Sequence, residues 1–207
     1  REIKNKISSA KNEMMSIDSF AKVEFDHKVV EVYKEYQQKL KNGNSVDFDD
    51  LLILPIKLFR NYPRVLEEYQ DRYKYILIDE YQDTNEAQYT FSKLLSAKYR
   101  NIFVVGDNDQ AIYAFRGANY KNILNFEKDY PEAKTILLEE NYRSTKTILN
   151  AANSVIKNNH ERKDKNLWSN NATGNKIKYK EVANEKEEAS FVGTEIKRLL
   201  SEGINEE

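Results

Sequence analysis

The chain has 207 residues, and its 33 Lys and Arg against 34 Asp and Glu give a formal net charge of −1. This balance excludes nucleic-acid binding through an overall positive charge, so any such contact must be local. The sequence lacks cysteine and has only two histidines, which excludes disulfides and leaves little for a zinc site. Because no apolar run approaches the roughly 18 residues of a membrane span, we expect no membrane insertion, and a cytoplasmic location fits the missing cysteine.

Residues 1–47 predict a helical segment, in which apolar side chains recur at helical spacing before Gly43 stops the helix. These side chains are Phe25, Val29, Val32, Tyr33, Tyr36 and Leu40. Asp47 is a predicted N-cap of the next helix, which Pro55 should bend or interrupt. Pro63 suits the first turn of another short helix.

The pattern changes at residues 75–78, a short apolar run that is typical of a strand buried on both faces. Similar runs at 102–105 and 135–138 predict a second and a third strand. Helices are predicted between them, at 85–97 and 120–128. Strands that alternate with helices indicate parallel pairing in an α/β sheet.

The last part of the chain predicts a helix at 148–156, with Ser144 as the preceding N-cap. Residues 158–175 are rich in Asn and Lys and are interpreted as a loop or linker. A strand near 177–182 and a helix at 185–200 complete the predicted elements.

Two adjacent carboxylates, Asp79 and Glu80, stand where the first predicted strand ends. Open α/β sheets place ligands at this carboxyl edge. One carboxylate there can hold Mg²⁺ while its neighbour orients or deprotonates a water that attacks a phosphoryl group. The alternative is a polar strand end without chemistry, and the dipeptide alone does not decide between them.

The second predicted strand is followed by Gly106, which permits a tight turn, and by Gln110, whose carboxamide suits a sensor of a γ-phosphate or its attacking water. The alternative is an ordinary turn before a helix. Tyr113, Phe115 and Arg116 come next, and aromatics beside an Arg can stack on unpaired bases and bind phosphates. The alternative places both aromatics in the core.

Arg143 follows the third predicted strand, directly before the predicted cap. A guanidinium here can reach a phosphate across a domain cleft, as arginine fingers do. The alternative is a surface salt bridge with Glu139 or Glu140, and the spacing leaves both interpretations open.

Three long motifs follow one another along the chain in the same order as in a known protein family. DEYQDTN at 79–85, VVGDNDQAIYAFRGA at 104–118 and LEENYRS at 138–144 resemble motifs II, III and IV of the superfamily 1 helicases of the UvrD/PcrA/Rep type. DFDDLL at 48–53 and AANSVIKNN at 151–159 are similar to the PcrA pattern of that family. The resemblance runs nearly end to end.

The resemblance implies a role for each site residue. Asp79 would coordinate Mg²⁺, with Glu80 beside it activating the hydrolytic water, and Gln110 would couple the γ-phosphate of ATP to the DNA-binding segment. The residues implied to contact single-stranded DNA are Tyr113, Phe115 and Arg116. Tyr142 would stack on the adenine and Arg143 would act as an arginine finger. Phe115 departs from the Trp usual in this family, so its stacking area is smaller.

A P-loop requires Gly followed by Lys and then Ser or Thr, and none of the six glycines precedes a Lys. Motifs V and VI of the family are also not found. We therefore expect an internal fragment, inactive by itself, with a partial RecA-like parallel sheet. The predicted division is the end of a helical insertion domain at 1–47, the second half of a first RecA-like domain at 48–138 and the start of a second at 139–207.

The resemblance implies an ATP-dependent DNA helicase that translocates 3′ to 5′ on single-stranded DNA, acts at junctions of single and double strands, and has repair or replication proteins as partners. One alternative is a helicase-nuclease, which shares these motifs. Another is a non-catalytic module that binds single-stranded nucleic acid. A magnesium-dependent phosphotransferase with Asp79 or Asp107 as acceptor is a third, and it lacks a matching Lys. An incomplete sheet would leave edges that favour self-association.

Overall fold

The computed structural model describes residues 2–160 and 162–204. The chain forms two compact units: unit 1 comprises Arg1–Leu137 and Asn158–Lys165, and unit 2 comprises Leu138–Lys157 and Asn166–Glu207. The backbone therefore returns from unit 2 to unit 1 at residues 158–165 and then enters unit 2 again. No helix within the described ranges is long and apolar enough to cross a membrane.

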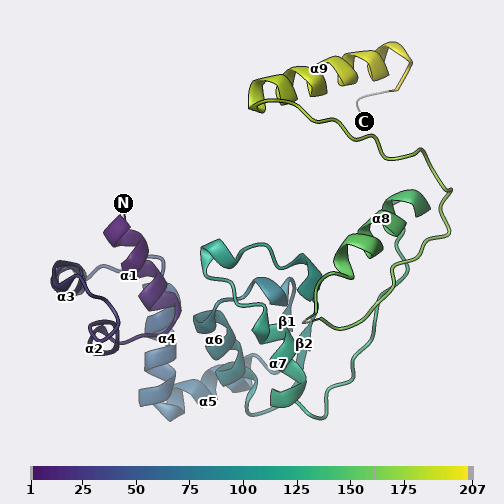
Figure 1. Ribbon diagram of the computed structural model, residues 1–207. Helices are drawn as coiled ribbons and strands as arrows, with labels where there is room; N and C mark the ends of the chain where they lie inside the picture. Colours follow the sequence, from purple (N-terminus) through teal and green to yellow (C-terminus); the bar gives the residue numbers. More distant parts are fainter. Residues whose placement is uncertain (1, 161, 205–207) are drawn as a thin grey trace. The chain divides into compact units, whose positions relative to one another are not determined.

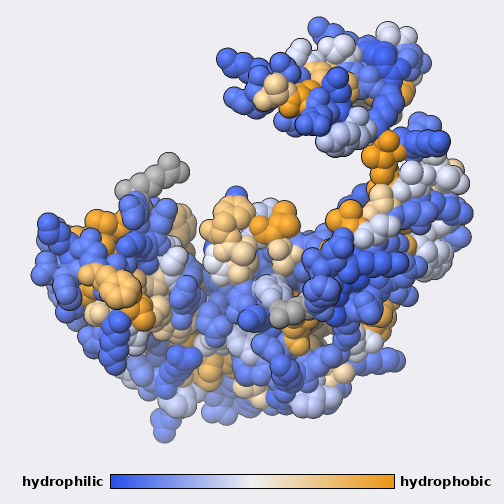
Figure 2. Space-filling model, viewed as in Figure 1, coloured by the Kyte–Doolittle hydropathy of each residue, from blue (hydrophilic) through white to orange (hydrophobic). Residues whose placement is uncertain are grey.

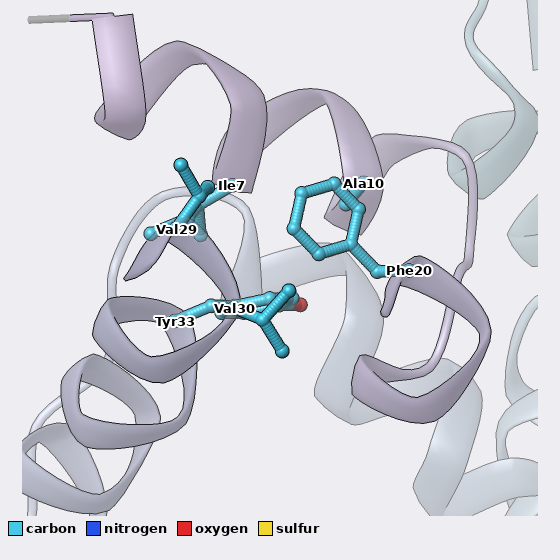
Figure 3. Close-up of a cluster of buried hydrophobic side chains, with 6 residues drawn as sticks. All are labelled: Ile7, Ala10, Phe20, Val29, Val30 and Tyr33. Carbon is cyan, nitrogen blue, oxygen red and sulfur yellow. The ribbon is translucent and has the colours of Figure 1, made fainter. Parts of the chain in front are cut away.

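The predicted helical segment is three helices, α1 (Glu2–Asn12), α2 (Ile17–Phe20) and α3 (His27–Asn42). Six buried side chains from these helices form one cluster (Figure 3): Ile7, Ala10, Phe20, Val29, Val30 and Tyr33. Gly43 ends α3 as predicted. Phe25 was expected on the apolar stripe but precedes the helix, because Asp26 is its N-cap, and its side chain is 97% exposed.

The next two helices are α4 (Asp50–Asn61) and α5 (Pro63–Arg72). Pro63 starts α5 as predicted, but Pro55 does not interrupt α4. The N-cap position of α4 is Asp49 and not the predicted Asp47, although Asp47 Oδ1 accepts a hydrogen bond of 2.8 Å from the N–H of Asp50. The packing of buried Ile56 against α6 offsets the backbone hydrogen bond that Pro55 removes.

A buried lysine joins α1 to the start of α4. Lys11 is 3% exposed, and its Nζ donates to Asp47 Oδ2 at 2.6 Å and to Asp50 Oδ1 at 2.9 Å. The Tyr36 hydroxyl donates to the same Asp47 oxygen at 2.9 Å. A buried cation is tolerated only when paired in this way, so this cluster fixes the register of α1 on α4.

The sheet consists of two parallel strands, β1 (Ile76–Ile78) and β2 (Ile102–Val104), which lie side by side in Figure 1. The helices α6 (Glu86–Ser96) and α7 (Lys121–Asp129) follow them, as predicted. This order agrees with a partial RecA-like α/β fold, although the described residues contain little sheet. The expectation of burial on both faces is wrong: the paired side chains of Leu77 and Phe103 are 74% and 60% exposed, because no described element covers that face fully.

Unit 2 contains α8 (Lys146–Ile156) and α9 (Glu185–Ser201). The helices agree with the prediction, but the N-cap of α8 is Thr145 and not Ser144. The strands predicted at 135–138 and 177–182 do not form. A strand needs a neighbour to accept its ladder hydrogen bonds, and the described residues supply only one isolated bridge nearby, between Glu140 and Trp168.

Several apolar side chains on both units are exposed. Figure 2 shows hydrophilic side chains over most of the face in view, with apolar patches between them. In the region without strands, Ile136, Leu138 and Tyr179 are 68%, 78% and 86% exposed. These apolar runs have the composition of strands, but in this chain they lack the partner that would bury them.

Candidate functional site

The two strands end at the same edge of the sheet. Ile78 is paired with Val104, the Val105 N–H donates to Ile78 O at 2.8 Å, and the Tyr81 N–H donates to Val105 O at 2.9 Å. The residues that follow the strands, Glu80 among them, are therefore neighbours of the segment that follows Val105. This is the edge at which open α/β folds bind ligands.

Glu80 lies in a tight turn directly after β1. Its φ of 49° is in the left-handed region, which is uncommon for a residue other than Gly. The backbone then forms a single 3₁₀ turn, η1 (Tyr81–Asp83), with Tyr81 1% exposed beneath it. Burial raises the pKa of the Tyr81 hydroxyl. The turn thus anchors one side chain in the core and presents the exposed carboxylates of Asp79 and Glu80 at the strand end.

A chain of hydrogen bonds connects Glu80 to Gln110. Gln82 is 1% exposed; its Nε2 donates to Glu80 Oε2 at 2.7 Å, and its Oε1 accepts from the Asp107 N–H at 2.9 Å. Asp107 Oδ2 in turn accepts from Gln110 Nε2 at 2.7 Å. The structure therefore brings together two of the predicted site residues, Glu80 and Gln110. The link runs through Gln82, which was not predicted, and Asp107, which was predicted only as the acceptor of a phosphotransferase.

Gly106 is required by this arrangement. A Cβ at Gly106 would lie 2.6 Å from Gln82 Oε1 and 2.8 Å from Ile123 Cδ1. At these distances a Cβ would displace both the Gln82 side chain and the Ile123 side chain. The glycine therefore allows close approach of the two turns, in addition to the tight turn that the sequence predicts.

Two cations from residues 158–165 cover the turn after β2. This turn is a 3₁₀ helix, η2 (Asn108–Gln110), and it begins beside Asp107, which pairs with Lys165. Arg162 binds both carboxylate oxygens of Asp109, with Nε at 3.2 Å and Nη2 at 2.9 Å. Burial raises the pKa of Asp107, but hydrogen bonds from Lys165, Gln110 and the Asp109 N–H outweigh it, so the pKa lies below its ordinary value.

These supporting residues were not predicted from the sequence, for different reasons. Gln82 stands inside the DEYQDTN motif, so its position between the acidic pair Asp79-Glu80 and Asp83 was the available signal. Arg162 and Lys165 lie in a stretch that looks like a linker, and nothing local distinguishes them from the neighbouring lysines. Only tertiary structure shows which of these cations are buried.

The two carboxylates after β1 fit a hydrated Mg²⁺. Asp79 Oδ1 accepts from the Glu80 N–H at 2.9 Å, and within the described residues no hydrogen bond occupies its Oδ2. The described residues contain no group of three or more His, Asp or Glu that could hold a metal by themselves. Mg²⁺ commonly uses only one or two carboxylates, with waters and substrate phosphates as its other ligands. The donor set therefore suits an ion that arrives with a nucleotide.

The aromatic segment lies just beyond η2. Tyr113 precedes the 3₁₀ turn η3 (Ala114–Arg116), and its ring centroid is 6.0 Å from that of Phe115. The Arg116 guanidinium lies 4.9 Å from the Tyr113 ring centroid and 5.4 Å from the Phe115 centroid. Phe115 is 78% exposed, which argues against the alternative that it belongs to the core.

Tyr142 and Arg143 lie in unit 2, whereas the strand-end residues lie in unit 1. Tyr142 is 79% exposed, and its hydroxyl donates to Glu140 Oε2 at 2.8 Å, which raises the pKa of the Tyr142 hydroxyl. Asn141 Oδ1 accepts from the N–H groups of Arg143 and Ser144. The salt-bridge alternative requires an ion pair of Arg143 with Glu139 or Glu140. No such pair is present in the described part of the chain.

Comparison with known proteins agrees with the motif order. The family model for the UvrD/REP helicase N-terminal domain matches residues 1–131, and that for the UvrD-like helicase C-terminal domain matches residues 136–207.

Among individual relatives, the chain is 55% identical over 200 residues to the ATP-dependent DNA helicase PcrA of Staphylococcus aureus strains Mu50 and NCTC 8325. It is 54% identical to the protein of the same name from Staphylococcus epidermidis strain RP62A. Each match covers 95% of this chain and 27% of the relative, so the chain spans about a quarter of the length of these proteins. With both family models matched in order, the chain belongs to the UvrD/REP helicase family.

Proposed function

We propose that this chain is part of an ATP-dependent DNA helicase, in which Asp79 and Glu80 face the phosphates of ATP with its Mg²⁺. The observation that carries the proposal is the hydrogen-bonded path from Glu80 through Gln82 and Asp107 to Gln110. It joins a carboxylate suited to orient a water to a carboxamide at the next strand end. Identity of 55% to PcrA supports the same activity for the whole protein.

Each residue has a definite task in this proposal. Asp79 holds the ion, which neutralises charge on the phosphates when bound. Glu80 orients the attacking water and accepts its proton. Because Asp107 occupies Gln110 Nε2, Gln110 Oε1 is left to accept a hydrogen bond from that water.

The residues of unit 2 complete the nucleotide site in the proposal. Tyr142 stacks on the adenine, and Arg143 stabilises the charge that develops on the transferred phosphoryl group. Tyr113, Phe115 and Arg116 bind single-stranded DNA by stacking and by charge. The domain division stated from the sequence, 3′ to 5′ translocation, a cytoplasmic location and partners in repair or replication belong to the same proposal.

The test is ATP hydrolysis by the complete protein with and without single-stranded DNA. Glu80→Gln keeps the shape of the side chain but cannot accept a proton, so the DNA-stimulated rate should fall about 10²- to 10⁴-fold while nucleotide binding is retained. Glu31→Gln, the same change on the exposed face of α3, is the matched control. An unchanged rate in Glu80→Gln would show that Glu80 is only a polar strand end.

A binding module for single-stranded nucleic acid is a second candidate, favoured by the exposed rings of Tyr113 and Phe115 with Arg116 over both. Fluorescence titration of the 207-residue chain with a labelled oligonucleotide separates the two. Tight binding without ATP favours the module. Weak binding by the chain and ATP-dependent unwinding by the complete protein favour the helicase.

A further inference from the structure

The segment 158–165 leaves unit 2 after α8, lies in unit 1 and returns to unit 2 at Asn166. An excursion of this kind orders a polar loop and carries an entropic cost. Its fixed points are two cations, Arg162 on Asp109 and Lys165 on Asp107. The loop is therefore held to unit 1 at the residues that follow β2.

The pair of Arg162 and Asp109 is buried, with both side chains 6% exposed. The guanidinium binds both carboxylate oxygens, which is the strongest geometry for such a pair. Removal of Arg162 would leave the buried Asp109 with Lys165 Nζ, at 3.6 Å, as its remaining cation. This geometry distinguishes the pair from the surface pair of Lys163 with Glu127, whose side chains are 45% and 51% exposed.

Lys165 acts on the carboxylate that holds Gln110. It pairs with Asp107 Oδ1, while Asp107 Oδ2 accepts from Gln110 Nε2. The cation keeps Asp107 ionised and oriented, so the Gln110 carboxamide has a fixed acceptor. Without Lys165, Asp107 would be a partly buried carboxylate without a cation at its Oδ1, held there by the Asp109 N–H at 3.0 Å, and its orientation toward Gln110 would be less firmly fixed.

We propose that Arg162 and Lys165 are positioning residues, which hold η2 so that Gln110 and the aromatic segment behind it stay aligned with Glu80. This inference rests on the proposed function, because it assigns the loop a part in the coupling of DNA binding to hydrolysis. The loop that joins two stretches of unit 2 thereby becomes a support of the site in unit 1.

The first test uses Lys165→Ala in the complete protein, with Lys163→Ala as the matched control from the same loop. Loss of one charged hydrogen bond should lower the ratio of hydrolysis rates with and without single-stranded DNA about tenfold. Lys163→Ala should leave that ratio unchanged. A merely structural role would lower both rates together, in proportion to the folded fraction, and would overturn the proposal.

A second readout does not depend on hydrolysis. Hydrogen exchange within residues 107–118 should rise about tenfold in Lys165→Ala, while exchange in α6 stays unchanged. Unchanged exchange in this segment would overturn the proposal even if hydrolysis occurs. Faster exchange in a complete protein that never hydrolyses ATP would support the positioning role and refute the proposed helicase function.

The role of Arg162 can still be tested if Arg162→Ala fails to fold, by exchanging the charges of Arg162 and Asp109. Arg162→Asp should raise exchange in residues 107–118, and the double variant Arg162→Asp with Asp109→Arg should restore most of the protection. Failure of the double variant to recover, in a protein that folds, would show that the pair does not position this turn.

Discussion

The two units differ in how much of their structure is buried. Unit 1 contains the clusters around Val29 and Ile56 and the buried polar chain through Gln82. Within the described part of unit 2, only Leu149 and Ser169 are buried, and no residue of α9 is. Within the described residues α9 has a side-chain N-cap at Asn184 but no buried face, whereas the helices of unit 1 also pack against one another. The strand-end site is therefore built in the unit that has a core of its own.

Substitutions that break an ion pair should give the largest difference in stability between the two units. Lys11→Met removes a buried cation and leaves Asp47 and Asp50 unpaired, so the free energy of opening of α1 and α4 should fall by about 3–5 kcal/mol. Hydrogen exchange measures it. Lys178→Met, at the exposed pair with Glu195 in unit 2, is the control and should change nothing measurable. Equal effects of the two variants would contradict the contrast between the units.

Glycine substitutions sharpen the comparison with a smaller effect. Gly106→Ala forces a Cβ against Gln82 and Ile123 in unit 1 and should cost about 1–3 kcal/mol of stability. Gly193→Ala lies in α9 with nothing within 4 Å of its Cβ and should stabilise that helix by about 0.5–1 kcal/mol. Urea unfolding measures both. A neutral Gly106→Ala would mean that the two turns can separate without loss.

Phe115 is an exposed residue of unit 1, at which an effect on DNA binding can be measured separately from an effect on stability. Phe115→Ala should leave the melting temperature unchanged because the ring is exposed, and it should weaken single-strand binding about ten- to a hundredfold. Oligonucleotide titration and thermal unfolding of the same variant measure both. Phe25→Ala is a matched control, since the Phe25 side chain is also exposed but lies away from the motif in the sequence. A lower melting temperature with unchanged affinity would show that Phe115 serves the fold.

Acid should weaken the buried Lys11 cluster of unit 1, with the smallest effect of the four tests. Burial raises the pKa of Asp47, but hydrogen bonds from Lys11, the Asp50 N–H and Tyr36 lower it more, so the folded-state pKa lies below the ordinary 3.8. The contribution is therefore complete above pH 3.8 and is lost as the pH falls through the lower folded value. Thermal unfolding between pH 7 and pH 2 should show this loss in the wild type. Lys11→Met should show a weaker dependence, and an identical profile would exclude the ion pair as its cause.

Much of the fold could be predicted because it depends on local signals. Gly43 predicts where α3 ends, and Pro63 predicts where α5 begins. The strands β1 and β2 are predicted by continuous apolar runs. The strands predicted at 135–138 and 177–182 failed because a strand depends on a partner that composition does not supply. The family followed from three motifs whose order is itself a sequence property.

The sequence by itself determined the family, the parallel order of β1 and β2, and the residue types at the strand ends. Only the tertiary structure decided that Gln82 joins Glu80 to Asp107 and that Lys11 is buried. It also decided which of the lysines and arginines in residues 158–165 face acids. The physical reason is that burial of a charge and the meeting of two turns depend on residues up to 58 positions apart, which no local pattern records.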